Sequence, residues 1–206
     1  MTRIKICGIT NKTDALGAAS LGVDMLGFVF FKKSKRYVEP MTAADIINEL
    51  PLSIARAGVF VDEKPDRVRE IAADAPLDTL QFHGNETPEY CASFKGEYKT
   101  IKAFRLKTRE DLKGINDYDV DFYLLDTHSE NAAGGTGEAF DWKMLENFEF
   151  LRPVILSGGL TPGNVSRAIK EVAPYGVDVS SGVEKAAGKK DMDLMKKFVE
   201  NVRKTG

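Results

Sequence analysis

The feature that most constrains the fold is an alternation, along the whole chain, of short apolar runs with longer amphipathic segments. Runs such as Phe122–Leu125 and Val154–Leu156 are apolar at consecutive positions, which is typical of strands covered on both faces in a parallel sheet. The alternation therefore predicts parallel strands separated by helices. The eight predicted strands are Ile4–Cys7, Met25–Phe30, Ile54–Val61, Thr79–Phe82, Tyr98–Phe104, Phe122–Leu125, Val154–Leu156 and Val177–Val179.

The amphipathic segments carry start signals for helices. The stretch from Thr42 to Asp45 resembles a capping box, and Thr87–Pro88 and Thr161–Pro162 each place a hydroxyl before a proline, a favoured first helical residue. The last segment, from Asp191, is predicted to be a helix with one apolar face, made of Leu194, Met195, Phe198, Val199 and Val202.

The number of strand–helix units indicates how the strands are arranged. The 206 residues allow about 26 residues for each of eight units, which suits a compact barrel. We expect an α/β fold, a single parallel (β/α)8 TIM barrel, formed by residues 1–206 as one domain. The alternative is an open doubly wound sheet, whose dinucleotide-binding form needs Gly-x-Gly-x-x-Gly after the first strand. The sequence Gly8-Ile9-Thr10-Asn11 follows Cys7 and lacks that motif.

Composition argues against several classes of partner. Lys and Arg total 29 against 31 Asp and Glu, so the basic excess of a nucleic-acid-binding protein is missing. No run approaches the about 18 apolar residues of a membrane span, and the first residues form no apolar signal segment. Cys7 and Cys91 are too far apart in sequence for a metal clip. We expect a reduced, cytoplasmic protein with no nucleic-acid, membrane or obligatory protein partner.

In a (β/α)8 barrel the chemistry lies at the C-terminal ends of the strands. Cys7 ends the first predicted strand and is a base, a nucleophile or an inert apolar residue, since free cysteines are commonly buried. Asp126 follows the sixth, where a carboxylate needs either a task or a helix to cap. Gln81 and His83 lie at the end of the fourth. The only other histidine, His128, forms no metal pair with His83, so we expect no metal site.

Two glycine-containing turns follow the seventh and eighth strands. They contain Ser157-Gly158-Gly159 and Ser180-Ser181-Gly182, and the second is expected to open a short extra helical turn. Each turn alone could simply be a tight connection. Together, at these strands, they predict a phosphate site, because glycine lets the backbone N–H groups approach an anion and this is the usual phosphate position in the fold.

Two further stretches allow more than one interpretation. The basic run Phe31–Arg36 is either a solvated loop or an anion site. The stretch Gly134–Gly137 lacks the Gly-Lys-Ser/Thr ending of a P-loop, so it is either a mobile lid at the catalytic face or a surface loop.

A series of short blocks along the chain matches one known family in order and spacing. The blocks are Lys5–Thr10, Gly27–Phe30, Ser34–Tyr37, Gly58–Val61, Leu80–Gly84, Leu125–Asp126, Gly134–Gly137, Ser157–Leu160 and Asp178–Glu184. Taken together, they resemble the phosphoribosylanthranilate isomerase family of tryptophan biosynthesis, from residue 4 to about residue 184. Phe82 stands where the family more often has leucine, an exchange between core residues.

The resemblance implies a cofactor-independent aldose–ketose isomerase. Its substrate is a small phosphorylated aminosugar, N-(5-phosphoribosyl)anthranilate, and its product is 1-(2-carboxyphenylamino)-1-deoxyribulose 5-phosphate. Cys7 is then the general base, with a thiol pKa at or below its ordinary value of ~8.5, and Asp126 the general acid. Arg36 binds the anthranilate carboxylate, and Gln81 and His83 position the sugar hydroxyls or the acid. The phosphate contacts are Gly158, Gly159, Ser181 and Gly182.

Two alternatives remain at this stage. One is another sugar-phosphate isomerase, epimerase or lyase on a phosphate-binding barrel. A metal-dependent epimerase would need several His and Asp ligands, and indole-glycerol-phosphate synthase would use a lysine at a strand end, whereas Lys5 precedes the end of its strand by two residues. The other is a non-enzymatic sugar-phosphate binding module, which the Cys7 and Asp126 pair disfavours.

Overall fold

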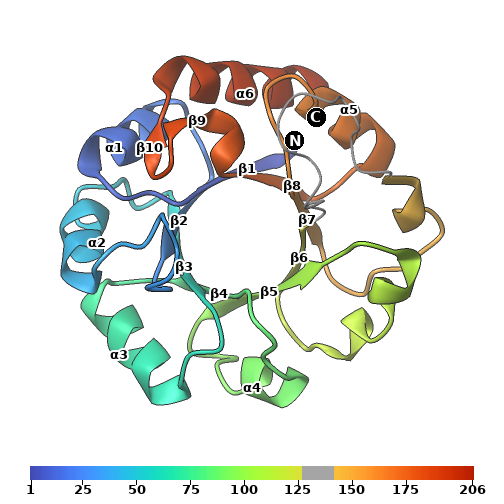
Figure 1. The fold of residues 1–206 in the computed structure, drawn as a ribbon, viewed down its shortest axis with the longest axis horizontal. Helices are drawn as coiled ribbons and strands as arrows, with labels where there is room; N and C mark the ends of the chain where they lie inside the picture. The colour runs from blue at the N-terminus through green and yellow to red at the C-terminus, as the bar shows by residue number, and fades with distance from the viewer. Residues whose placement is uncertain (127–141) are drawn as a thin grey trace.

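Eight parallel strands close into a barrel in the computed structural model, which describes residues 1–126 and 142–206 (Figure 1). Each strand pairs with the next along the chain, and β8 pairs with β1 to complete the ring. The predicted fold class is confirmed, and every predicted strand is present with bounds within one residue of the prediction. The strands are β1 (Arg3–Cys7), β2 (Met25–Val29), β3 (Ala55–Phe60), β4 (Thr79–Phe82), β5 (Lys99–Arg105), β6 (Phe122–Asp126), β7 (Val154–Ser157) and β8 (Gly176–Val179).

Helices form a ring outside the strands, as Figure 1 shows. They are α1 (Lys12–Ser20), α2 (Pro40–Ile47), α3 (Pro65–Asp74), α4 (Pro88–Ala92), α5 (Val165–Val172) and α6 (Met192–Thr205). Short 3-10 turns are η1 (Arg109–Leu112) and η2 (Ile115–Asp117) after β5, η3 (Trp142–Leu145) before β7, and η4 (Ser181–Val183) after β8. A small hairpin, β9 (Glu184–Ala186) and β10 (Lys189–Lys190), follows η4 and packs against α1, where Lys190 N donates to Asp14 Oδ2.

Two predicted helix starts are confirmed. The Asp191 carboxylate accepts hydrogen bonds from the first backbone N–H groups of α6, and the Thr87 hydroxyl accepts from Tyr90 N in α4. These side chains satisfy N–H groups that have no partner inside the helix, which is why the chain turns helical there.

Two other predicted starts are wrong. Thr42 lies inside α2, which begins at Pro40, because the fixed φ of proline suits the first turn and starts the helix earlier. After β7, the helix α5 begins at Val165, directly after Asn164, and not at the predicted Thr161–Pro162. The Asn164 side chain accepts a hydrogen bond from Thr161 N at 2.8 Å, which closes a separate turn ahead of the helix.

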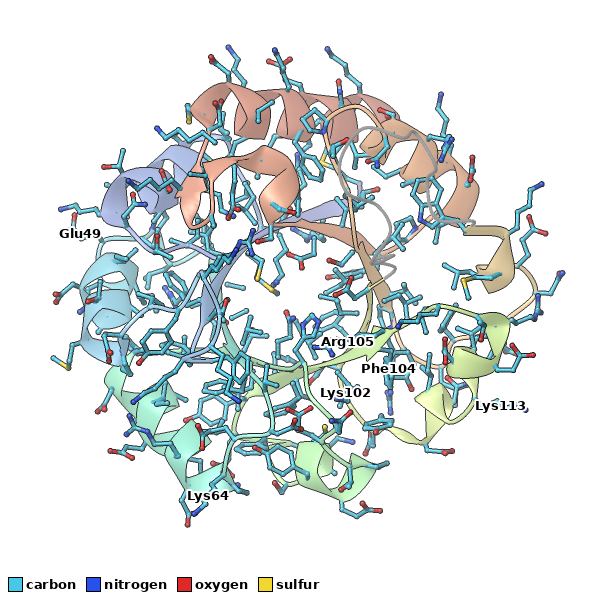
Figure 2. All side chains as sticks on the ribbon, viewed as in Figure 1. Glu49, Lys64, Lys102, Phe104, Arg105 and Lys113 are labelled. Carbon is cyan, nitrogen blue, oxygen red and sulfur yellow. The ribbon has the colours of Figure 1, made fainter. Side chains whose placement is uncertain are left out.

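The apolar core has two layers, one between the strands and the helices and one inside the barrel. The inner layer contains Ile101, Ala103, Leu124 and Ile155. Among the described residues, charged side chains are also buried, including Lys5, Asp178 and Lys102. Figure 2 shows Lys102 on the helix-facing side of β5. Burying a charge costs free energy unless it is paired, so such groups mark positions with a particular task.

Candidate active site

The C-terminal ends of the strands bring the predicted site residues to one mouth of the barrel. Cys7 ends β1 and Asp126 ends β6, and in the ring of strands these two are separated by β7 and β8. A thiol and a carboxylic acid on non-adjacent strands can act on different atoms of one bound molecule, which is the arrangement that acid–base catalysis needs.

The carboxylate of Asp126 belongs to a chain of side-chain hydrogen bonds. His83 Nε2 lies 3.2 Å from Asp126 Oδ2, and Gln81 Nε2 lies 2.9 Å from His83 Nδ1. Because the Gln81 amide donates to Nδ1, the imidazole proton stands on Nε2 and points at Asp126. The His83 and Asp126 side chains are only partly buried, with 20% and 21% of their surfaces exposed, so the acid is held in place and still reaches the mouth.

The thiol of Cys7 lies almost buried against Gly27, its partner in the register of β1 and β2. A Cβ added at Gly27 would lie 2.8 Å from Cys7 Sγ, closer than packed atoms allow, so glycine provides the space for the sulfur. Burial raises the pKa of the Cys7 thiol, against the opposing effects of Lys5 and Lys190. The expectation that this pKa lies at or below its ordinary value is therefore wrong, because the sequence does not reveal how completely the thiol is withdrawn from water.

Arg36 is held in a fixed orientation beside Cys7. Its Nε and Nη2 donate to the two carboxylate oxygens of Glu184 at 2.8 and 2.6 Å, a forked contact. Although burial acts in the opposite direction, hydrogen bonds from Arg36 and Lys190 lower the pKa of Glu184. Gly8 has a left-handed φ of 78° and a Cβ there would lie 2.5 Å from Arg36 Cδ, so glycine lets the arginine lie over the end of β1.

The two glycine turns lie against each other. Gly158 and Gly159 both adopt left-handed φ, at 88° and 65°, which glycine adopts without strain. A Cβ on Gly182 would lie 1.9 Å from the backbone oxygen of Leu160, so only glycine allows the turn after β8 to approach the turn after β7 this closely. The predicted extra helical turn after β8 is present as η4. The structure thus brings together Gly158, Gly159, Ser181 and Gly182.

Some predictions lie beyond the part of the chain that the structure describes. The stretch Gly134–Gly137, interpreted as a lid or a surface loop, and the second histidine, His128, fall within residues 127–141, outside the described residues. Within residues 1–126 and 142–206, no group of His, Cys, Asp and Glu side chains is arranged to hold a metal ion. No helix in the same described part is long and apolar enough to span a membrane.

Comparison with known proteins places this site in a family. The family model for N-(5'-phosphoribosyl)anthranilate isomerase matches residues 4–201. The chain belongs to the N-(5'-phosphoribosyl)anthranilate isomerase family. The family resemblance inferred from the sequence is confirmed.

Individual members of the family match over nearly their whole length. The isomerase of Desulforudis audaxviator is 49% identical over 205 residues, covering 98% of each chain. The crystal structure of the isomerase from Thermotoga maritima superposes with a TM-score of 0.92 at 42% identity, covering 99% of this chain and 100% of that one. A further isomerase, solved in complex with reduced 1-(o-carboxyphenylamino)-1-deoxyribulose 5-phosphate, has a TM-score of 0.87 at 39% identity, covering 99% of this chain and 100% of that one.

Four charged residues support this site and were not among the predicted site residues. Lys5 and Asp178 form an ion pair below Cys7, and Glu184 and Lys190 hold Arg36 and the strand ends. Asp178 and Glu184 lie within a block that resembles the family, which is a weak signal for them. Lys190 carries no such signal, because its contacts to Cys7 O at 2.6 Å and Ser180 O at 3.1 Å depend on how the hairpin folds back.

Proposed function

We propose that this chain isomerises N-(5'-phosphoribosyl)anthranilate to 1-(2-carboxyphenylamino)-1-deoxyribulose 5-phosphate in tryptophan biosynthesis, with Cys7 as the general base and Asp126 as the general acid. The observation that carries the assignment of roles is their placement on separate strands at one mouth, between an oriented arginine and a pair of interlocked glycine turns. The solved relative that binds a reduced form of this product supports the choice of substrate.

The reaction needs one proton delivered and one removed. Protonation of the ring oxygen by Asp126 breaks the bond from C1′ to that oxygen, and the lone pair of the anthranilate nitrogen forms an iminium. The Cys7 thiolate then takes the proton from C2′, and the electrons of that bond move to the iminium to give an enolamine. The enolamine tautomerises to the ketone. The substrate nitrogen is the electron sink, so two positioned side chains are sufficient.

His83 serves the acid rather than the sugar hydroxyls in this assignment. Its Nε2 is bound to Asp126 and its Nδ1 to Gln81, so both ring nitrogens are engaged within the protein. The Gln81 amide donates to Nδ1 and so fixes the orientation of the ring that contacts Asp126.

Arg36→Ala tests the carboxylate contact. Glu184 occupies the Nε and Nη2 edge of the guanidinium, and the edge formed by Nη1 and Nη2 can take the anthranilate carboxylate in a second forked contact. Truncation should lower kcat/KM by a factor that corresponds to about 1.5–3 kcal/mol of lost binding free energy, the value of a charge-assisted contact. Steady-state kinetics with the substrate and with an analogue that lacks the carboxylate provide the measurement.

Lys33→Ala is the matched control, because Lys33 is an exposed cation in the same loop. It should leave kcat/KM unchanged. Equal discrimination against the analogue by the wild type and Arg36→Ala would show that Arg36 does not recognise the carboxylate.

Gly182→Ala tests the phosphate site. The added Cβ, 1.9 Å from Leu160 O, must push the two glycine turns apart. A displacement of this size should lower kcat/KM about 10²-fold, mainly through KM, and weaken inhibition by inorganic phosphate to the same degree. Gly163→Ala is the control in the same region, since its Cβ would meet only Thr161 Oγ1 at 3.6 Å. A folded Gly182→Ala protein with unchanged phosphate inhibition would remove the phosphate assignment.

The pH dependence follows from the environment of the base. Burial raises the pKa of the Cys7 thiol, so the reactive thiolate is scarce at neutral pH and becomes more abundant as the pH rises. Because Asp126 must be protonated while Cys7 is ionised, we expect kcat/KM to depend on pH as a bell, whose limb at higher pH has its midpoint above the ordinary thiol value of ~8.5. The residual activity of Cys7→Ala should lack this limb. Two limbs that both lie well below the ordinary thiol value would contradict the effect of burial.

A further inference from the structure

A buried ion pair lies inside the barrel directly below the proposed base. Lys5 Nζ lies 2.9 Å from Asp178 Oδ1, and the two side chains are only 3% and 6% exposed. Ser157 Oγ lies 3.2 Å from the other carboxylate oxygen of Asp178. The interior around them is otherwise lined with apolar side chains such as Ile101 and Leu124. A buried ion pair is seldom more stabilising than well-packed apolar residues, so its presence here calls for a reason other than stability.

The position of Lys5 points to that reason. Lys5 and Cys7 are separated by one residue on β1, so their side chains lie on the same side of the strand and both point into the barrel. The space beside Gly27 brings them together, since a Cβ there would lie 2.8 Å from Cys7 Sγ and 3.2 Å from Lys5 Nζ. Of the three N–H groups of the ammonium, one reaches Asp178, and the others are free to turn toward the sulfur.

Charged groups face Cys7 from three directions. Lys5 and Asp178 face it from the barrel interior, Arg36 lies above it, and Lys190 approaches from the hairpin with Glu184. The Lys190 ammonium donates hydrogen bonds to three oxygens: the backbone oxygens of Cys7 and Ser180 and one carboxylate oxygen of Glu184. The strand ends and the hairpin therefore set the position of Lys190, whereas Lys5 is held by Asp178 with its charge beside the sulfur.

Both lysines are buried, and their surroundings act on them differently. Burial lowers the pKa of Lys190. For Lys5, the attraction of Asp178 and Cys7 outweighs burial, and its pKa is raised. The surroundings of Lys5 therefore favour its charged form, which is what a partner for a thiolate requires.

We propose that Lys5, held by Asp178, is the positioning residue that stabilises the thiolate of Cys7 for proton abstraction. Lys5 neither gains nor loses a proton: the thiolate takes the C2′ proton and becomes a thiol, and the ammonium stays paired with Asp178. The catalytic part of this proposal rests on the proposed role of Cys7 as the base. The electrostatic part concerns the resting protein and can be measured without turnover.

The test is a thiolate titration of the full-length protein. Ultraviolet thiolate absorbance is followed against pH in the wild type, Lys5→Met and Lys5→Arg, each corrected with the same variant carrying Cys7→Ala. Cys91 does not interfere, because burial raises its pKa to about 12. In Lys5→Met the midpoint for Cys7 should rise by at least about one pH unit, a tenfold loss of thiolate at fixed pH. Lys5→Arg should restore most of the thiolate, and Lys99→Met, an exposed lysine at the far end of β5, should change nothing.

Lys5→Met leaves the Asp178 carboxylate buried without its partner, so a second variant guards against misfolding. Lys5→Met/Asp178→Asn removes both charges, and its Cys7 midpoint should still lie above that of the wild type, because Lys5 affects the thiol more strongly than Asp178 does. An unchanged midpoint in either folded variant would overturn the proposal.

Activity separates this proposal from the proposed function. The limb of the kcat/KM profile at higher pH should move further up in Lys5→Met, together with the titration. If Cys7→Ala retains turnover, Cys7 is not the base and the proposed function of Cys7 fails, whatever the titration shows. If Cys7→Ala is inactive and the Cys7 titration does not move in Lys5→Met, the proposal for Lys5 fails and the role of Cys7 stands.

Discussion

Cys7→Ala and Asp126→Ala should each lower kcat by at least about 10²-fold, the lower end for a positioned base or acid. Substrate affinity should change much less, because the phosphate and carboxylate contacts come from the glycine turns and Arg36. Cys7→Ser should also be poor, since a hydroxyl ionises far less readily than a thiol. Single-turnover and steady-state kinetics on freshly generated substrate, in the presence of EDTA, measure both effects.

Cys91→Ala is the matched control for the base. Cys91 is also a free, buried cysteine, but it lies in α4 among core residues and away from the barrel mouth. Its replacement should cost stability and leave kcat close to that of the wild type. A Cys7→Ala enzyme with near wild-type turnover would show that Cys7 is a core residue and not the base.

Lys102→Met should destabilise the fold by about 3–5 kcal/mol, the cost of leaving a buried charge without its partner. Lys102 Nζ lies 2.7 Å from Glu86 Oε2, and the two side chains are 3% and 1% exposed. Glu86 also accepts from Asp62 N and Gly84 N at 2.9 Å each, and Lys102 donates to Gly84 O at 2.8 Å. The pair therefore joins the ends of β3, β4 and β5. Figure 2 shows Lys102 on the helix-facing side of β5.

Urea unfolding followed by circular dichroism measures this loss as a change in the free energy of unfolding. Lys102→Met/Glu86→Gln should recover part of it, because the second change removes the unpaired charge. Lys95→Met is the control at an exposed pair with Asp119, where the loss should stay below about 1 kcal/mol. Equal losses at the buried and the exposed lysine would show that the buried pair does not hold the strand ends.

Local sequence patterns were sufficient for the strands, and the resemblance to a family then singled out the proposed reacting groups. Apolar runs are long enough to determine each strand within one residue, and residues at or just beyond the end of a run, such as Cys7, His83 or Asp126, then fall at the barrel mouth. Helix starts were less certain, because several residues compete for the same cap. Pro40 precedes Thr42 in α2, and Asn164 closes a turn before α5, so two of the predicted starts were wrong.

The electrostatics of the site were decided by the tertiary structure. Lys5 and Asp178 are 173 residues apart, and Arg36 and Glu184 are 148 apart, yet each pair is in direct contact because β8 closes against β1. A pKa depends on burial and on charges a few ångströms away, and neither can be deduced from neighbours in sequence. The sequence by itself determined the barrel and which residues stand at its mouth. Only the closure of the barrel decided that the Cys7 thiol is buried, which cation lies beside it and how Arg36 is oriented.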